Sequence, residues 1–162
     1  MTIVNNVTRL LDSRKIKYTA YELPNEKLGA QETAALLGID PSIVYKTIVI
    51  SCEKPKKPIL VLLPGTRVVD LKLVATALGE KKVTLPTERE AESITGLRAG
   101  GISPLAVINK GFTVLIDDSA QNFTEIHISG GQRGLNIKVG LHDLADLIKA
   151  RITQVSRPGF IV

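Results

Sequence analysis

The sequence predicts a single domain of the α+β class. Helical patterns stand at both ends of the chain, strand patterns fill much of the middle, and strands and helices do not alternate as a regular βαβ series requires. The chain has 162 residues, of which 44% are hydrophobic, so it is long and apolar enough to bury one compact core. We therefore expect residues 1–162 to form one domain without a long linker.

The first part of the chain is expected to contain two helices, a strand and a helical turn. Apolar residues recur at helical spacing near the N-terminus, at Val4, Val7, Leu10 and Leu11. This helix should end near Ile16 and be followed by a short strand over residues 17–23. A second helix should cover residues 31–37 and end at Gly38, and Asp40 before a proline predicts a capped turn.

Residues 44–52, VYKTIVISC, predict a strand with an unexpected lysine. Alternation places Lys46 on the same face as Ile48 and Ile50, and Thr47 on the other. The ammonium either reaches water from a strand end or lines a polar pocket, where it offers donors and a charge to a phosphate or ribose. The periodicity favours neither interpretation. Residues 59–63 should pair with this strand as a hairpin through the EKPKKP connection.

The second half of the chain shows two further capped helices, a strand, and then a series of strands. Asp70 should cap a helix that ends at Gly79, and Thr87 should begin another that ends at Gly96, with a short strand over residues 81–86 between them. The later expected elements are strands over residues 113–116, 124–129 and 135–139 and a closing helix over residues 141–150.

Two glycine-rich segments stand out, GLRAGGISPLA at residues 96–106 and SGGQRGLNI at residues 129–137. Glycine lets a backbone approach a ligand closely, so the two loops can form one cradle of N–H groups; the alternative is a pair of ordinary turns. Neither segment matches a Walker or dinucleotide fingerprint, so spacing alone favours turns. Ser129 shares a strand face with His127, and a tight return would bring Asn136 beside Ser129.

The remaining reactive residues give weak signals. Cys52 is the only cysteine, which excludes an internal disulfide, and its place on the strand favours a buried thiol over a nucleophile. One cysteine and two histidines without HExxH-type spacing do not predict a metal site. A triad can be assembled on paper from Ser129, His127 or His142, and Asp117, but no nucleophile-elbow sequence supports it.

Three features of the sequence bear on the cellular compartment of the protein. No basic and then apolar leader opens the sequence, the single cysteine fits a reducing compartment, and the apolar runs are far shorter than the roughly 20 residues of a membrane helix. We expect a cytoplasmic protein without a membrane partner.

Taken in order, VYKTIVI, GGISPLA and SGGQRGLNI resemble the YbaK family of editing domains associated with prolyl-tRNA synthetase, and the likeness covers nearly the whole chain. The resemblance implies a mixed, partly closed β-sheet packed by helices. It is strongest to the free-standing branch, and so implies a trans-editing hydrolase that deacylates mischarged Cys-tRNA(Pro) and serves translation. A second site is needed because a synthetase pocket cannot reject cysteine well. No cofactor or metal is implied.

The resemblance also implies the site residues. The implied catalytic residues are Lys46, Gly100, Gly101 and Ser129. The implied substrate-binding residues are Tyr21, Leu28, Thr47, Ile102, Ser103, Pro104, Gly130, Gly131 and Asn136. Leu28 stands where a close relative has phenylalanine, and Asn136 where an aspartate is expected, so both departures bear on amino-acid selectivity.

The implied mechanism needs no protein nucleophile, because the substrate's own thiol attacks its ester carbonyl while N–H donors stabilise the oxyanion. The implied partners are cysteine-charged tRNA(Pro) and prolyl-tRNA synthetase. A net charge of +5 allows lysines to meet the tRNA backbone, namely Lys54, Lys56, Lys57, Lys81 and Lys82. Two alternatives stay open: an Ala-tRNA(Pro) deacylase, and a non-catalytic module that binds tRNA ends or nucleotides.

Overall fold

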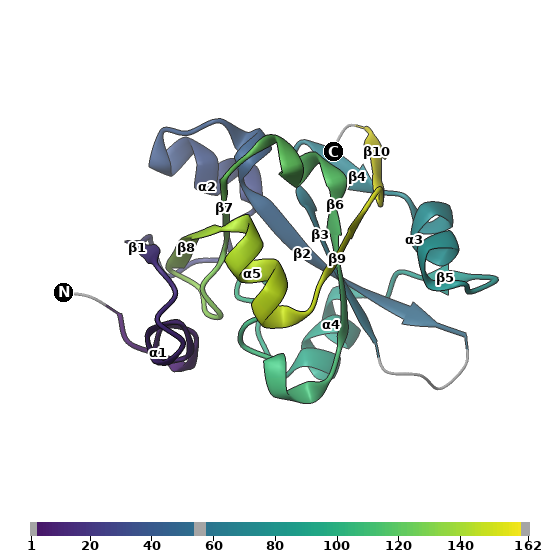
Figure 1. Ribbon diagram of the computed structural model, residues 1–162, viewed down its shortest axis with the longest axis horizontal. Helices are drawn as coiled ribbons and strands as arrows, with labels where there is room; N and C mark the ends of the chain where they lie inside the picture. Colours follow the sequence, from purple (N-terminus) through teal and green to yellow (C-terminus); the bar gives the residue numbers. More distant parts are fainter. Residues whose placement is uncertain (1–2, 54–57, 160–162) are drawn as a thin grey trace.

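The computed structural model describes residues 3–53 and 58–159, and within them it confirms the α+β class (Figure 1). The α-helices are α1 (Asn6–Ser13), α2 (Ala30–Leu37), α3 (Leu71–Leu78), α4 (Glu88–Thr95) and α5 (Leu141–Ile148). Short 3-10 helices are η1 (Pro41–Ile43), η2 (Ile108–Lys110) and η3 (Asp118–Asn122). Over these residues, none of the helices has the length and apolarity needed to cross a membrane.

The strands form three sheets. A mixed sheet has the order β5 (Val83–Thr84), β2 (Tyr45–Cys52), β3 (Ile59–Pro64), β6 (Thr113–Asp117) and β9 (Arg151–Thr153). An antiparallel sheet has the order β1 (Tyr18–Glu22), β8 (Leu135–Gly140) and β7 (Glu125–Ser129). The third sheet pairs β10 (Ser156–Pro158) with β4 (Arg67–Val69).

The two larger sheets meet without forming a closed barrel among the described strands. A single parallel bridge joins Val44, just before β2, to His127 in β7. Beyond this bridge, β2 pairs with β3 along one edge, while its other edge pairs with β5 only at Ser51 and Cys52. The stretch of β2 around Lys46 and Thr47 therefore has an edge that none of the described strands covers.

Core residues lie on both faces of the mixed sheet. Leu60 and Leu62 of β3 belong to the larger cluster with α1 and α5, whereas Val61 and Leu63 belong to a smaller cluster with α3. A strand covered on both faces reads as an unbroken apolar run, which is why residues 59–63 do not alternate with polar residues. Cys52 packs against the smaller cluster and is half-buried rather than buried.

The predicted helix ends are confirmed where a cap was recognised. Asp70 accepts from the backbone N–H groups of Lys72 and Leu73, and Gly79 ends α3 in the left-handed conformation. The closing helix is shorter than expected: α5 ends at Ile148 because Lys149 adopts the left-handed conformation with φ 53°.

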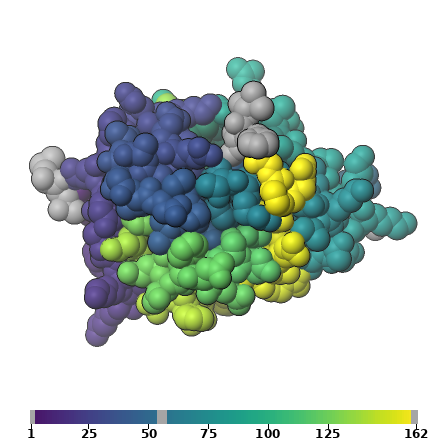
Figure 2. Space-filling model, turned by 90° about the horizontal axis from the view of Figure 1, so that it is seen from above, coloured from purple at the N-terminus to yellow at the C-terminus, as the bar shows by residue number. Residues whose placement is uncertain are grey.

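Three strands were not predicted. β4, β9 and β10 have three residues each, too few for a period of two to stand out, and β10 carries a proline. Seen from above, β10 in yellow lies against the teal region that contains β4 (Figure 2), as their antiparallel pairing requires. The predicted β2–β3 hairpin is confirmed, but the lysines of its connection, Lys54, Lys56 and Lys57, lie outside the described residues.

Candidate functional site

A cavity of about 530 Å³ opens beside the uncovered edge of β2. Four other segments complete its walls: residues 23–33, the start of α4 with the residues before it, the first glycine loop, and the ends of β7 and β8. This volume lies within the usual range for small-molecule sites, about 300–1,000 Å³. Seven of the residues expected from the sequence line it, namely Leu28, Lys46, Thr47, Gly100, Ile102, Ser129 and Asn136.

The two glycine loops, far apart in the sequence, contact each other at this cavity. Arg133 Nε donates to the carbonyl of Ala99 at 2.7 Å. A Cβ atom added at Gly101 would lie 2.9 Å from Gln132 Cα, so only glycine allows the two backbones to come this close. Gly100, with φ 89°, lies against the backbone of Lys27. The loops therefore form one wall, as the cradle hypothesis required.

Most of the N–H groups expected to line this cradle are already used within the protein. Gly101, Gly130 and Gly131 donate, in that order, to Arg98 O at 2.8 Å, Leu135 O at 2.8 Å and Ser129 Oγ at 3.2 Å. Among the described residues, no acceptor is found for Gly100 N–H. Of these four glycines, Gly100 alone lines the cavity and keeps a donor for a ligand.

Ser129 and Asn136 are direct partners in the β7–β8 ladder, as the tight return predicted. Ser129 Oγ accepts from Gly131 N–H, which leaves its hydroxyl hydrogen able to donate elsewhere. Asn136 is buried and its Oδ1 lies 2.8 Å from Nδ1 of His127. Burial lowers the pKa of His127, against the opposing effect of the Asn136 hydrogen bond.

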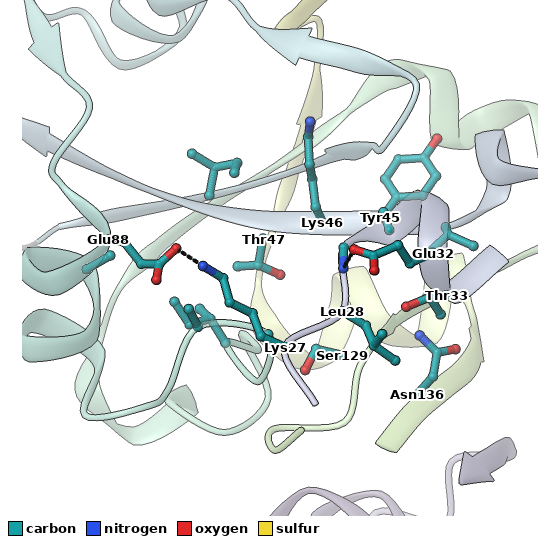
Figure 3. A pocket seen from close by; sticks show the side chains of 18 of the residues that line it. Lys27, Leu28, Glu32, Thr33, Tyr45, Lys46, Thr47, Glu88, Ser129 and Asn136 are labelled. Atoms are coloured by element: carbon teal, nitrogen blue, oxygen red, sulfur yellow. Dashed lines mark hydrogen bonds and ion pairs between the residues drawn. The ribbon is translucent and has the colours of Figure 1, made fainter. Parts of the chain in front are cut away.

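Thr47 carries the sharpest signal in the cavity. Its Oγ1 is buried, and within residues 3–53 and 58–159 it is the one buried side-chain oxygen or nitrogen that has no hydrogen-bond partner. Such an orphaned group destabilises a protein by about 1–3 kcal/mol unless a ligand satisfies it. Figure 3 shows the Thr47 side chain on the same side of β2 as Ser129.

Lys46 is also a lining residue, but its ammonium is held on the other side of β2. Nζ donates to the carbonyl of Arg67 in β4 at 2.9 Å. Arg67 is fixed in turn, because its Nε donates to Ser156 Oγ of β10 at 2.6 Å. Burial lowers the pKa of Lys46, and two of its three N–H donors have no acceptor among the residues that the structure describes. The two unpredicted strands thus hold the lysine in place.

Six expected residues do not line the cavity. Tyr21 packs its ring on that of His127, with centroids 5.5 Å apart. Ser103 is fully buried and its Oγ accepts from Leu105 N at 3.2 Å, while Pro104 borders a separate small cavity. Gly101, Gly130 and Gly131 act in the contact between the loops and in their turns.

The sequence did not reveal an ion pair at the cavity. Lys27 Nζ lies 2.5 Å from Glu88 Oε2, and this pair links the segment before α2 to the start of α4 (Figure 3). Positions 61 residues apart carry no local signal of such contact. The position of Glu32 could have been predicted from the sequence, because Glu32 is the third residue of α2 and its carboxylate accepts from Gly29 N, as in a capping box.

The triad weighed from the sequence is not assembled. Asp117 belongs to β6, and its oxygens accept from the Ser119 hydroxyl at 2.5 Å and from Val155 N at 3.1 Å. His127 is engaged by Asn136 instead. Over the described parts of the chain, no three His, Cys, Asp or Glu side chains are grouped to hold a metal ion. The site offers positioning groups rather than a nucleophile.

Comparisons with known proteins found a matching family model and similar sequences. A family model described as an aminoacyl-tRNA editing domain matches residues 24–147. A protein of Enterococcus faecalis, named provisionally as the Cys-tRNA(Pro)/Cys-tRNA(Cys) deacylase EbsC, is 30% identical over 153 residues, which cover 93% of this chain and 92% of that protein. A proline–tRNA ligase of Limosilactobacillus fermentum is 26% identical over 106 residues, covering 64% of this chain and 18% of the ligase.

Two solved structures share the fold. The hypothetical protein APE2540 is 20% identical, with a TM-score of 0.86 over 94% of this chain and 100% of that one. A structure described provisionally as a trans-editing enzyme for prolyl-tRNA synthetase is 22% identical, with a TM-score of 0.78 over 96% of this chain and 99% of that one.

Proposed function

The chain belongs to the family of aminoacyl-tRNA editing domains, and we propose that it hydrolyses mischarged Cys-tRNA(Pro) in trans. The name of the Enterococcus relative supports this substrate, since the two proteins align over nearly their full lengths. Such a reaction takes place where tRNA is charged, so the proposal includes a cytoplasmic location and a role in translation.

The observation that carries the proposal is the orphaned hydroxyl of Thr47 in a cavity of about 530 Å³. Thr47, Ser129 and Gly100 line this space from three different segments, and the Thr47 O–H, the Ser129 O–H and the Gly100 N–H have no acceptor among the described residues. An aminoacyl ester is already activated, so catalysis requires its positioning and the stabilisation of the oxyanion that develops on its carbonyl. Donors held in place before the reaction suit that task.

Lys46 is proposed to hold the terminal nucleotide rather than the reacting carbonyl. Its ammonium lies across β2 from Thr47, where the two N–H groups not used by Arg67 can bind a phosphate oxygen. In this arrangement the strand separates the nucleotide contact from the ester contact. The lysine and the threonine then bind different parts of one substrate.

We propose that the substrate thiol acts as the nucleophile. Its sulfur bonds to the ester carbonyl carbon, the bond from that carbon to the ribose oxygen breaks, and the thiol proton ends on the released ribose hydroxyl. The product is a cyclic thioester, which water opens to cysteine. Ser129 Oγ accepts a hydrogen bond from Gly131 N–H. Among the described residues, no basic side chain is hydrogen-bonded to Ser129 Oγ to activate it as a nucleophile.

The partner proposed with the tRNA is prolyl-tRNA synthetase, which would supply specificity for tRNA(Pro). Aromatic residues make up 4% of the chain, too few for a platform that stacks the bases of a single strand. Lys81 and Lys82 are exposed before β5 and are available to the tRNA backbone.

The test measures ester hydrolysis on cysteinyl-, alanyl-, seryl- and prolyl-tRNA(Pro), each with and without the synthetase. We expect cysteinyl-tRNA(Pro) to be hydrolysed fastest and prolyl-tRNA(Pro) to survive. Survival of the cysteinyl ester in both conditions overturns the proposal, and preferential hydrolysis of the alanyl ester selects the alanine-specific alternative. Equal rates on the seryl and cysteinyl esters exclude the thiol mechanism.

A further inference from the structure

His127 and Asn136 form a buried pair behind the cavity wall. His127 is 3% exposed and Asn136 5%, and His127 Nδ1 lies 2.8 Å from Asn136 Oδ1. A carboxamide oxygen carries no hydrogen, so the proton of this bond resides on Nδ1. The neutral imidazole then has Nδ1 as donor and Nε2 unprotonated.

The imidazole is itself held from two directions. The backbone of His127 forms the bridge to Val44, which joins β7 to the start of β2. Its ring packs against that of Tyr21, with an interplanar angle of 37°. Tyr21 pairs in register with Asn136 across β1 and β8, so the ring that supports the imidazole sits on the strand next to the amide. The imidazole ring of His127 is therefore held in place, and its Nδ1 keeps a fixed position beside Asn136 Oδ1.

The bond to His127 decides which end of the Asn136 carboxamide meets the cavity. With Oδ1 turned toward the imidazole, Nδ2 turns the other way, and Figure 3 shows the nitrogen of Asn136 on the side of Leu28 and Ser129. Within the described chain, no group accepts a hydrogen bond from Nδ2. The cavity wall therefore presents amide N–H donors at this point.

We infer that His127 is a positioning residue that makes Asn136 a hydrogen-bond donor, so that the cavity binds an oxygen lone pair of its substrate there and disfavours a cationic amine. This inference rests on the proposed function for the identity of the substrate. In an aminoacyl-adenosine end, the oxygens that qualify are the ester carbonyl and the ribose hydroxyl. The ammonium of the amino acid must then lie elsewhere in the cavity, where Glu26, Glu32 and Glu88 are lining residues.

The first experiment tests the geometry without any substrate. Nitrogen-15 NMR of the histidine side chains, assigned with His142→Gln, reports which ring nitrogen of His127 carries the proton. We expect protonation at Nδ1 alone, with the Asn136 side-chain amide protons resolved. Protonation at Nε2 alone would turn Asn136 around, place its oxygen in the cavity and overturn the inference.

The second experiment tests recognition with two stable probes. One is adenosine that carries cysteine through an amide at its 3′ position, and the other has the amide carbonyl reduced to methylene, which makes a cationic amine. We expect wild type to prefer the amide probe and Asn136→Asp to reverse that preference. His127→Leu should weaken the amide probe about tenfold, the effect of losing roughly one oriented hydrogen bond.

His127→Asn is the matched control, because its side-chain amide can donate where Nδ1 does and it is close in size to leucine. It should bind the amide probe nearly as wild type does, and circular dichroism should show both variants folded. A folded His127→Leu protein with wild-type affinity, or an Asn136→Asp protein with unchanged preference, overturns the inference. If wild type binds neither probe, the proposed function and the recognition step fail together, while the NMR result still judges the pairing.

Discussion

Lys46 and Thr47 are neighbours in β2, yet their side chains leave the strand in opposite directions (Figure 3). The lysine ammonium donates to Arg67 O at 2.9 Å, whereas the threonine hydroxyl is buried without a partner among the described residues. Alternation along a strand is enough to cause this separation. One dipeptide thereby serves two parts of the site, and the two side chains require separate tests.

Replacing Thr47 with valine should affect stability and activity in opposite ways. Valine keeps the shape and removes an unsatisfied buried oxygen, so the free energy of unfolding should stay the same or rise by about 1 kcal/mol. Hydrolysis of the cysteinyl ester should fall at least about tenfold, because a donor to the substrate is lost. Thermal unfolding and single-turnover hydrolysis measure the two effects.

Thr47→Ser keeps the hydroxyl and provides the control for Thr47→Val. It should retain most of the activity while losing a little stability with the methyl group. If the valine variant proved both less stable and fully active, the hydroxyl would have a structural role and no contact with substrate.

The charge of Lys46 should make binding depend on alkaline pH. Burial lowers the pKa of Lys46 from its ordinary value of 10.5, so the ammonium loses its proton at a lower pH than an exposed lysine does. Affinity for the amide-linked cysteinyl adenosine 5′-phosphate should therefore fall with a midpoint below 10.5. Titration calorimetry from pH 7 to pH 10.5 measures this decline.

Lys46→Arg separates charge from other alkaline effects, because arginine keeps its proton over this range. Its affinity should be lower than that of wild type, since the guanidinium fits the Arg67 carbonyl differently, but it should not decline with the same midpoint. A decline shared by wild type and the arginine variant would assign the effect to another group.

The sequence predicted the parts of this site that depend on neighbouring residues and not the parts that depend on distant ones. Alternation put Lys46 and Thr47 on opposite faces, and the short turn after Ser129 put Asn136 beside it. The support of Lys46 comes from β4 and β10, which are 89 residues apart at the Arg67–Ser156 contact. No local pattern encodes such a pairing.

The glycine loops show the same limit in another form. Their composition indicated close backbone approach, and Gly101 does lie against Gln132. Composition could not indicate which N–H groups the turns themselves would use, and three of the four expected donors are used in this way. Which backbone N–H groups of a loop are already hydrogen-bonded can be read only from its three-dimensional structure.

Gly101→Ala should force the two glycine loops apart. The added Cβ would lie 2.9 Å from Gln132 Cα and 3.1 Å from Arg133 N, and neither backbone atom can move without shifting its loop. Overpacking of this kind destabilises by about 1–3 kcal/mol. Hydrolysis should fall as well, because Gly100 beside it supplies the donor in the cavity.

Gly140→Ala offers a control at a glycine with room. Its nearest neighbour to an added Cβ is Asp143 Oδ2 at 3.6 Å, and its φ of −62° suits any residue. Urea unfolding should show a change within about 1 kcal/mol. Equal stability of the two alanine variants would contradict the close contact between the loops.

The buried imidazole of His127 should make the protein less stable in mild acid. Burial lowers the pKa of His127 in the folded state, so between its folded pKa and its ordinary value of 6.5 the unfolded chain binds a proton that the folded protein does not. The free energy of unfolding is therefore highest above pH 6.5 and falls as the pH drops below it, by at most about 1.4 kcal/mol per pH unit for one proton.

Neighbouring charges and a control variant test this assignment to His127. Lys138 on β8 lowers the pKa of His127 further, so replacing Lys138 by a neutral residue should make the loss of stability in acid smaller. Glu125 on β7 raises that pKa, so replacing Glu125 by a neutral residue should make the loss larger. His127→Asn has no imidazole at this position and should lose this part of the slope between pH 7 and pH 5, measured by urea unfolding. A slope that matches wild type would show that another group binds the proton.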